Sequence, residues 1–183
     1  NGLDFRPISL LATDYKIFTR VLANRLRPLL PSIGHPGQAG FVPGQDIHAA
    51  IDAFQRHQET ESANPDSEAV ALLLDFAKDT LKRDHMLDAL ADAGLPWEFR
   101  LIVAAMHRNT QATFLVNGFQ SAPLLVTRGI RQGCPLAPML FILALNPLYT
   151  KQSQHPGIKG LRLPDAIEDD TVKGFADDTA LYR

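Results

Sequence analysis

The spacing of hydrophobic residues along the chain predicts five helices. In residues 14–30 the apolar positions recur at helical intervals, and Pro31 ends the segment. Residues 46–59 repeat this pattern, and residues 83–94, 96–109 and 135–152 are three further candidates, the last strongly apolar. The residues expected on the buried faces of the first two helices are Ile17, Phe18, Val21, Leu22, Leu26, Leu29, Ile47, Ile51 and Phe54.

Three other segments favour strands. The run "AVALLLDF" (69–76) is short, apolar and unbroken, which predicts a strand buried on both faces. Residues 112–126 carry Asn117-Gly118, a pair that tolerates the positive φ angles of a tight hairpin turn. Residues 171–182, "TVKGFADDTALY", predict strand, turn and strand. Helices mixed with a few strands predict an α+β domain.

Composition adds limits to this picture. The 183 residues, 45% hydrophobic and 21% charged, suit one globular domain with room for two lobes. The formal net charge of −2 creates no overall basic field for nucleic acid. Residues 1–34 hold five Lys or Arg against two Asp, which fits either a local basic face or, as we favour, a solvated helix surface.

Several classes of protein and site are disfavoured. Cys134 is the only cysteine, so neither an internal disulfide nor a cysteine-based zinc site is expected, and the six histidines show no ligand spacing. No apolar run approaches the ~18 residues of a membrane span. The opening residues lack a signal peptide, so we expect a protein that is not secreted. Because the chain begins at Asn1 and stops at Arg183, we also expect a fragment of a longer protein.

Three aspartates lie next to apolar segments. Asp75 ends one predicted strand, and Asp177 and Asp178 lie at the bend between two others. A buried carboxylate is costly unless it is paired or binds a cation. If the segments 69–76 and 171–182 are neighbours in a sheet, the three carboxylates converge. Oxygen ligands of this kind suit Mg²⁺, and two ions about 3.5–4 Å apart would serve phosphoryl transfer.

Simpler interpretations of these acids stay open. An Asp-Asp pair is common in turns, because Asp makes local backbone hydrogen bonds, and an Asp at a strand end is ordinary. Other acids nearby fit a solvated loop and are not assigned to metal: Asp165, Glu168, Asp169 and Asp170. Their spacing does not follow a 12-residue calcium loop, which disfavours a calcium-binding module.

Six segments taken together resemble one known family. "RPISLLATDYKIFTRVLANRL", "GQAGFVPGQDI", "LLLDFAK", "LVNGFQS", "RGIRQGCPLAPMLFILALNPL" and "GFADDTALY" follow one another in this order. The set is similar to the reverse transcriptase domain of non-LTR, LINE-like retrotransposons. The likeness covers nearly the whole chain, and "RQGCPL-P" followed by "FADD" is its most specific part.

This resemblance implies a right-hand polymerase with fingers and palm and with the thumb absent. Residues 1–68 would be mainly fingers, and residues 69–183 mainly palm with some fingers elements. Asp75, Asp177 and Asp178 would be the catalytic metal ligands, with the carbonyl of Phe76 as a further ligand close to the nucleotide. Two Mg²⁺ ions are implied, with Mn²⁺ as a substitute. The implied partners are an RNA template, a DNA primer and deoxynucleoside triphosphates, in the nucleus or cytoplasm.

The "RQG" loop is the second site that the resemblance implies. Gly133 lacks Cβ and permits close approach of nucleotide or template, and Gln132 would hydrogen-bond there. Arg128 or Arg131 would meet phosphate, and Arg6 is a weaker candidate on the fingers side. Taken alone, Gly133 equally fits a turn that leads into the helix after Pro135.

One segment departs from the family pattern. Where the family has "DFAKAYD", this chain reads "DFAKDTLKRD", two residues shorter between Lys78 and Asp79. The missing aromatic lies under the incoming sugar in the family. This departure, with the absent thumb, supports an alternative function: a catalytically defective remnant of a mobile element that binds nucleic acid weakly.

Overall fold

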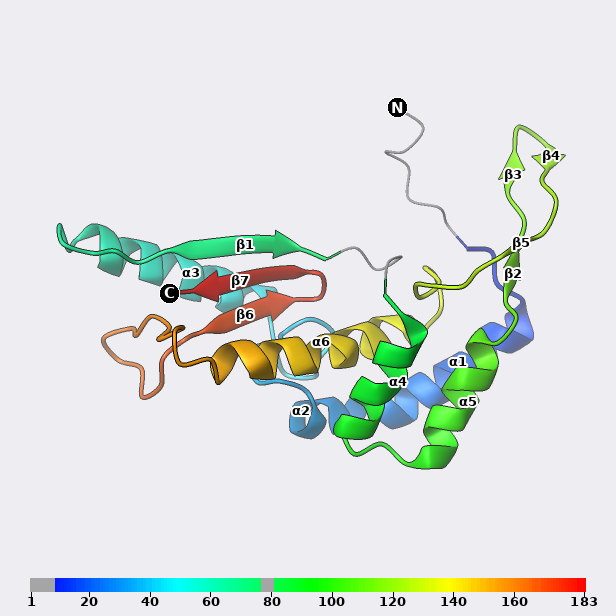
Figure 1. Ribbon diagram of the computed structural model, residues 1–183, viewed down its shortest axis with the longest axis horizontal. Coiled ribbons are helices and arrows are strands. Elements are labelled where there is room, and N and C mark those ends of the chain that lie inside the picture. The colour runs from blue at the N-terminus through cyan, green and yellow to red at the C-terminus, as the bar shows by residue number, and fades with distance from the viewer. Residues whose placement is uncertain (1–8, 77–80) are drawn as a thin grey trace.

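The structure is a computed structural model that describes residues 9–76 and 81–183 as a small sheet beside a layer of helices (Figure 1). This arrangement confirms the α+β prediction, and a helix forms in each of the five predicted segments. The helices are α1 (Thr13–Leu26), the 3-10 turn η2 (Arg27–Leu29), α2 (Leu30–Ile33), α3 (Ile47–Ser62), α4 (Arg83–Asp92), α5 (Trp97–His107) and α6 (Ala137–Ser153).

The main sheet brings together the two predicted acidic segments. β1 (Ala71–Asp75), β7 (Asp178–Tyr182) and β6 (Val172–Phe175) form an antiparallel sheet in the order β1-β7-β6. Two strand ends that lie 103 positions apart in the sequence therefore meet, since Asp75 pairs with Asp178. The expectation that these elements are neighbours in a sheet is confirmed.

β1 differs from the sequence prediction. It was expected to be buried on both faces, yet Leu72 is 52% exposed and Leu73 is 67% exposed. Among the described residues, the strand pairs with β7 alone and forms one edge of the sheet. An unbroken apolar run indicates hydrophobic side chains on both faces but does not show what covers them, so this prediction was wrong for the described residues.

α1 and α3 bury only part of the faces expected for them, and Leu22 and Leu26 are the expected residues that are buried. In α1 the buried residues are Thr19, Leu22, Ala23 and Leu26. Ile17, Phe18 and Val21 are 62%, 46% and 45% exposed. In α3, which Asp46 caps by accepting a hydrogen bond from the His48 backbone at 3.0 Å, the one buried residue is His57. The predicted helices form, but tertiary packing covers only part of each predicted apolar face.

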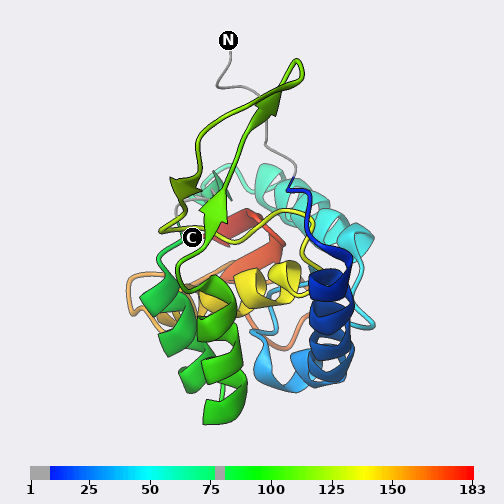
Figure 2. The ribbon, with the colours of Figure 1, turned by 90° about the vertical axis from the view of Figure 1, so that its right-hand side faces the viewer.

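α6 is the centre of the core. Its residues from Met139 to Leu145 are all buried, and α4 packs along it. A second, smaller cluster of Phe141, Leu145, Tyr149 and Val172 joins α6 to the sheet, and Figure 2 shows α6 beside the strands. The sheet is therefore packed against the central helix of the core.

A two-part hairpin projects from the helical layer (Figure 2). β2 (Gln111–Ala112) pairs with β5 (Leu124–Leu125), and β3 (Leu115–Val116) pairs with β4 (Phe119–Gln120). Asn117 and Gly118 take φ angles of 51° and 82°, which confirms the predicted turn. In the described part of the chain, no helix has the length and apolarity needed to cross a membrane.

Candidate metal and nucleotide site

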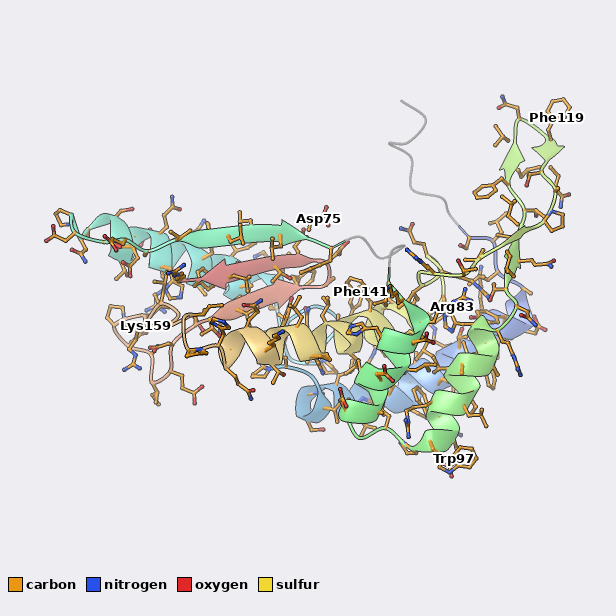
Figure 3. All side chains as sticks on the ribbon, in the orientation of Figure 1. Asp75, Arg83, Trp97, Phe119, Phe141 and Lys159 are labelled. Carbon is orange, nitrogen blue, oxygen red and sulfur yellow. The ribbon has the colours of Figure 1, made fainter. Side chains whose placement is uncertain are left out.

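Two of the predicted catalytic aspartates lie opposite each other across one strand pair. Asp75, the last residue of β1, is the register partner of Asp178, the first residue of β7. Directly opposed residues project to the same face, with Cβ atoms about 4.5–5.5 Å apart in sheets generally. Both side chains are exposed, and Figure 3 shows Asp75 at the strand end beside the β6–β7 turn.

The third aspartate belongs to the turn itself. Ala176 and Asp177 connect β6 to β7, and Ala176 has a φ of 59°, which is rare for a residue other than glycine. This is the bend that the sequence required before neighbouring aspartates could serve one centre. The carbonyl of Asp177 accepts a hydrogen bond from the Phe76 backbone at 3.1 Å, so β1 and the turn stay joined beyond the last strand pair.

The turn is held from behind by the loop before α3. The Gln38 side chain is only 2% exposed and lies against Ala176. Its Oε1 accepts hydrogen bonds from the backbone N–H of Ala176 at 2.9 Å and of Gly40 at 2.8 Å. Its Nε2 donates to the Ala176 carbonyl and to the Tyr149 hydroxyl, both at 3.3 Å. These contacts use the full hydrogen-bonding capacity of the amide.

Three glycines permit this close approach. A Cβ on Gly40 would lie 2.2 Å from the Ala176 nitrogen, and one on Gly37 would lie 2.3 Å from the Val172 carbonyl oxygen. A Cβ on Gly174 would lie 2.0 Å from the Tyr149 hydroxyl. Sequence reasoning did not identify Gln38 as part of the site. The signal it missed was an amide flanked by two glycines, which is typical of close backbone contact.

The "RQG" loop leads into α6, and its three residues differ in their exposure and in their contacts. Gly133 is exposed with a φ of 93°, and Gln132 is half-buried. Arg131 donates to the Met106 carbonyl at 3.1 Å and to the Thr110 hydroxyl at 3.0 Å. Its guanidinium also lies 5.1 Å from the Tyr15 ring centre.

These contacts favour a structural role for Arg131, which ties α5 to α1, whereas Arg128 is exposed. The loop and the acidic turn share one packing cluster. Phe76 and Ile130 both contact the cluster that joins α6 to the sheet. The predicted site residue Arg6 lies outside the described residues, as do Lys78, Asp79 and Thr80 of the shortened segment.

The remaining acids of the predicted solvated loop are mostly engaged in ion pairs. Asp165 pairs with Arg56, and Asp169 pairs with Arg162. Asp170 contacts Lys173 at 2.7 Å and His57 at 3.0 Å. These partners account for Asp165, Asp169 and Asp170 without a metal ion.

The donor set at the sheet tip suits a hard cation. Within residues 9–76 and 81–183, no three His, Cys, Asp or Glu side chains are grouped closely enough to form an all-protein metal cage. Mg²⁺, however, is usually held by one or two carboxylates together with water and substrate phosphates. The opposed pair of Asp75 and Asp178 fits that mode of binding.

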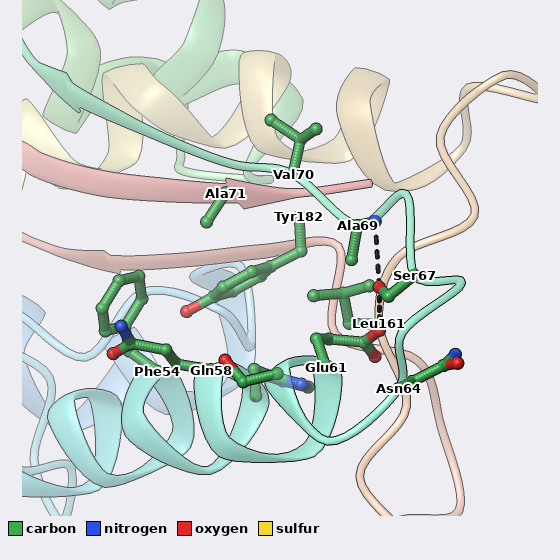
Figure 4. A pocket seen from close by; sticks show the side chains of 12 residues that line it. Phe54, Gln58, Glu61, Asn64, Ser67, Ala69, Val70, Ala71, Leu161 and Tyr182 are labelled. Carbon is green, nitrogen blue, oxygen red and sulfur yellow. Dashed lines mark hydrogen bonds between the residues drawn. The ribbon is translucent and has the colours of Figure 1, made fainter.

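A cavity of about 380 Å³ lies elsewhere, between α3 and the sheet (Figure 4). It is lined by Phe54, Gln58, Val70 and Tyr182, among others. Because Ala71 and Tyr182 pair at the opposite end of the strands from Asp75 and Asp178, this cavity is separate from the acidic tip. Its wall is completed by Ser67, which donates to Glu61 at 2.6 Å.

Comparison with known proteins covers the whole chain. The family model described as "Reverse transcriptase (RNA-dependent DNA polymerase)" matches residues 1–183. A Xenopus laevis protein named "Transposon TX1 uncharacterized 149 kDa protein" is 30% identical over 97% of this chain and 14% of its own length. A Drosophila melanogaster Pol polyprotein from retrotransposable element R2DM is 28% identical over 98% of this chain and 16% of its own length.

A third relative, the R2 Pol polyprotein of Popillia japonica, is 27% identical over 100% of this chain and 25% of its own length. Among solved structures, apo telomerase from Candida tropicalis gives a TM-score of 0.47 at 12% identity, over 92% of this chain and 34% of that chain. This chain thus spans about a quarter or less of these curated relatives. The match along all 183 residues shows that the chain belongs to the reverse transcriptase (RNA-dependent DNA polymerase) family, in the form carried by non-LTR retrotransposons.

Proposed function

We propose that this chain is the part of an RNA-directed DNA polymerase that holds the nucleotidyl-transfer site. The observation that carries the proposal is the pairing of Asp75 with Asp178 at an exposed sheet tip, with Asp177 next to them in the turn. The substrates would be an RNA template, a DNA primer and deoxynucleoside triphosphates, as the family implies.

The residues of the chain act here mainly by positioning. Asp75 and Asp178 would hold Mg²⁺ from opposing strands, with Asp177 and the Phe76 carbonyl as additional oxygen donors. Bound divalent ions would supply charge stabilisation for the attacking 3′-oxygen and the leaving pyrophosphate. Gly133, which presents no side chain, and Gln132 would contact the incoming nucleotide or the template. We place Arg131 in the support of this loop and Arg128 in contact with phosphate.

Incorporation of one nucleotide tests the proposal. The chain, in excess over a primed RNA template, is given one deoxynucleotide with Mg²⁺ or Mn²⁺. We expect detectable addition by the wild type and a loss of 100-fold or more in Asp178→Asn, since a metal ligand is removed. Asp88→Asn, at an exposed position on α4, should leave the rate unchanged. Equal rates in Asp178→Asn and the wild type would rule out this site.

The shortened segment after Phe76 favours a second candidate function, a folded remnant without catalysis. Insertion of Ala-Tyr between Lys78 and Asp79 separates the two. Activity in both chains supports a working polymerase domain. Activity only in the lengthened chain would show that the acidic site is sound and that the lost residues disabled the remnant.

A further inference from the structure

The structure assigns a role to a residue far from the acidic tip in sequence: we propose that Gln38 is a positioning residue that fixes the Ala176–Asp177 turn so that the aspartates can bind a divalent cation. This inference rests on the proposed function, because it deepens the account of the same site. Gln38 itself touches neither the substrate nor the metal in this account.

The orientation of the Gln38 amide follows from its partners. The backbone N–H groups of Gly40 and Ala176 can only donate, so the acceptor oxygen must face them. The amide nitrogen then faces the Ala176 carbonyl and the Tyr149 hydroxyl. Gln38 therefore binds both the N–H and the C=O of Ala176, the residue of this turn that carries the unusual φ angle.

A second chain of hydrogen bonds runs from Gln38 to the residue that follows Asp177 and Asp178. The Tyr149 hydroxyl accepts from Gln38 and lies 2.6 Å from the Thr179 hydroxyl. A tyrosine hydroxyl keeps its proton at neutral pH, and burial raises the pKa of Tyr149 further, so this hydroxyl can share a proton with Thr179. Ala176 precedes Asp177 and Thr179 follows Asp178, so the network holds the residues on both sides of the pair.

The surrounding backbone makes this arrangement stiff. The chain at Gly37–Gln38 bridges β6 in parallel, with Gly174 donating to the Gly37 carbonyl at 2.7 Å and Ala39 donating to the Gly174 carbonyl at 2.8 Å. A left-handed backbone at a non-glycine residue costs energy and persists only where its surroundings over-determine it. Two hydrogen bonds of the buried Gln38 amide constrain Ala176 directly, and its bonds to Gly40 and Tyr149 hold the amide itself in place. The exposed carboxylates of Asp75 and Asp178 are thereby held without being covered.

Manganese binding tests this role without any need for turnover. Mn²⁺ alone is titrated into the folded chain and followed by water proton relaxation enhancement. Gln38→Met preserves side-chain length but removes all four hydrogen bonds, and we expect Mn²⁺ affinity to fall about 10-fold or more, as for lost supporting contacts at metal sites. Val103→Ala, in the helical core away from the sheet, controls for general destabilisation and should stay within about twofold of the wild type.

The outcomes separate this inference from the proposed function. If Asp178→Asn abolishes Mn²⁺ binding while Gln38→Met behaves like Val103→Ala, the positioning role is overturned and the metal site stands. If Asp178→Asn binds Mn²⁺ as the wild type does, the proposed site fails and the inference falls with it.

If Gln38→Met does not fold, Mn²⁺ binding by Tyr149→Phe tests the positioning role instead. It retains the bonds between Gln38 and Ala176 and breaks only the path to Thr179, so we expect a smaller loss of affinity, about twofold to fivefold. Wild-type affinity in this variant would overturn the role of the network.

Discussion

Gly174 shows how closely individual residues constrain the site. Its missing side chain leaves room for the Tyr149 hydroxyl, which a Cβ would meet at 2.0 Å. The same hydroxyl contacts Gln38 and Thr179. Packing and hydrogen bonding behind the acidic turn therefore depend on one another.

A double-mutant cycle tests this dependence. Gly174→Ala should lower the free energy of unfolding by about 1–3 kcal/mol through overpacking. In a Tyr149→Phe background, which removes the nearest clashing atom, the same change should cost less. Urea unfolding of the four proteins measures the coupling. If the free-energy changes of the two single substitutions add exactly in the double mutant, the contact between residue 174 and the Tyr149 hydroxyl is contradicted.

The buried residue His107 should make the free energy of unfolding depend on pH. Burial lowers its pKa, and the nearby Arg83 and Arg131 lower it further, against a raising effect from its hydrogen bond to Val103. The unfolded chain therefore binds a proton at higher pH than the folded chain does. The free energy of unfolding should decrease as the pH falls below about 6.5.

Urea unfolding at pH 7.5 and 5.5 measures this difference. His35 contributes in the same direction, since burial and then Lys173 lower its pKa. His107→Gln should therefore reduce the difference without removing it, and the exposed His155→Gln should leave it unchanged. If His107→Gln loses as much free energy of unfolding between pH 7.5 and 5.5 as the wild type does, His107 is not a source of the pH dependence.

At the scale of elements, local patterns predicted what forms but not always what is buried. Asn117-Gly118 specified a turn by its own backbone preferences, and Gly94, with a φ of 75°, follows the end of α4. The contact between Gln38 and Ala176 could not be predicted in this way, because it joins residues 138 positions apart. The exposed faces of α1 and β1 depend on tertiary packing, which a single apolar stripe does not encode.

Because β1 lies at the edge of the sheet, we expect substitutions of its exposed side chains to have little effect on stability. Leu73→Ser should change the free energy of unfolding by less than about 1 kcal/mol, because the side chain is 67% exposed. Leu143→Ala, at a fully buried position in α6, should cost about 2–5 kcal/mol. A loss at Leu73 as large as that at Leu143 would show that β1 is covered in solution.

At the scale of the whole molecule, the acidic tip is open and the chain carries a net charge of −2. Affinity for nucleic acid comes largely from Lys and Arg on phosphates, and this chain has no excess of either. We expect it to add few nucleotides per binding event. Primer extension in the presence of an excess of unlabelled competitor duplex measures this. Long products made under that condition would contradict the expectation.

We propose that Asp75, Asp177 and Asp178 form one divalent-metal site at the sheet tip. Anomalous diffraction from crystals grown with Mn²⁺ tests it most directly. We predict an anomalous peak in contact with carboxylate oxygens of both Asp75 and Asp178. Mn²⁺ bound only at other acids, such as the Asp169–Asp170 segment, with none at the tip, would contradict the account.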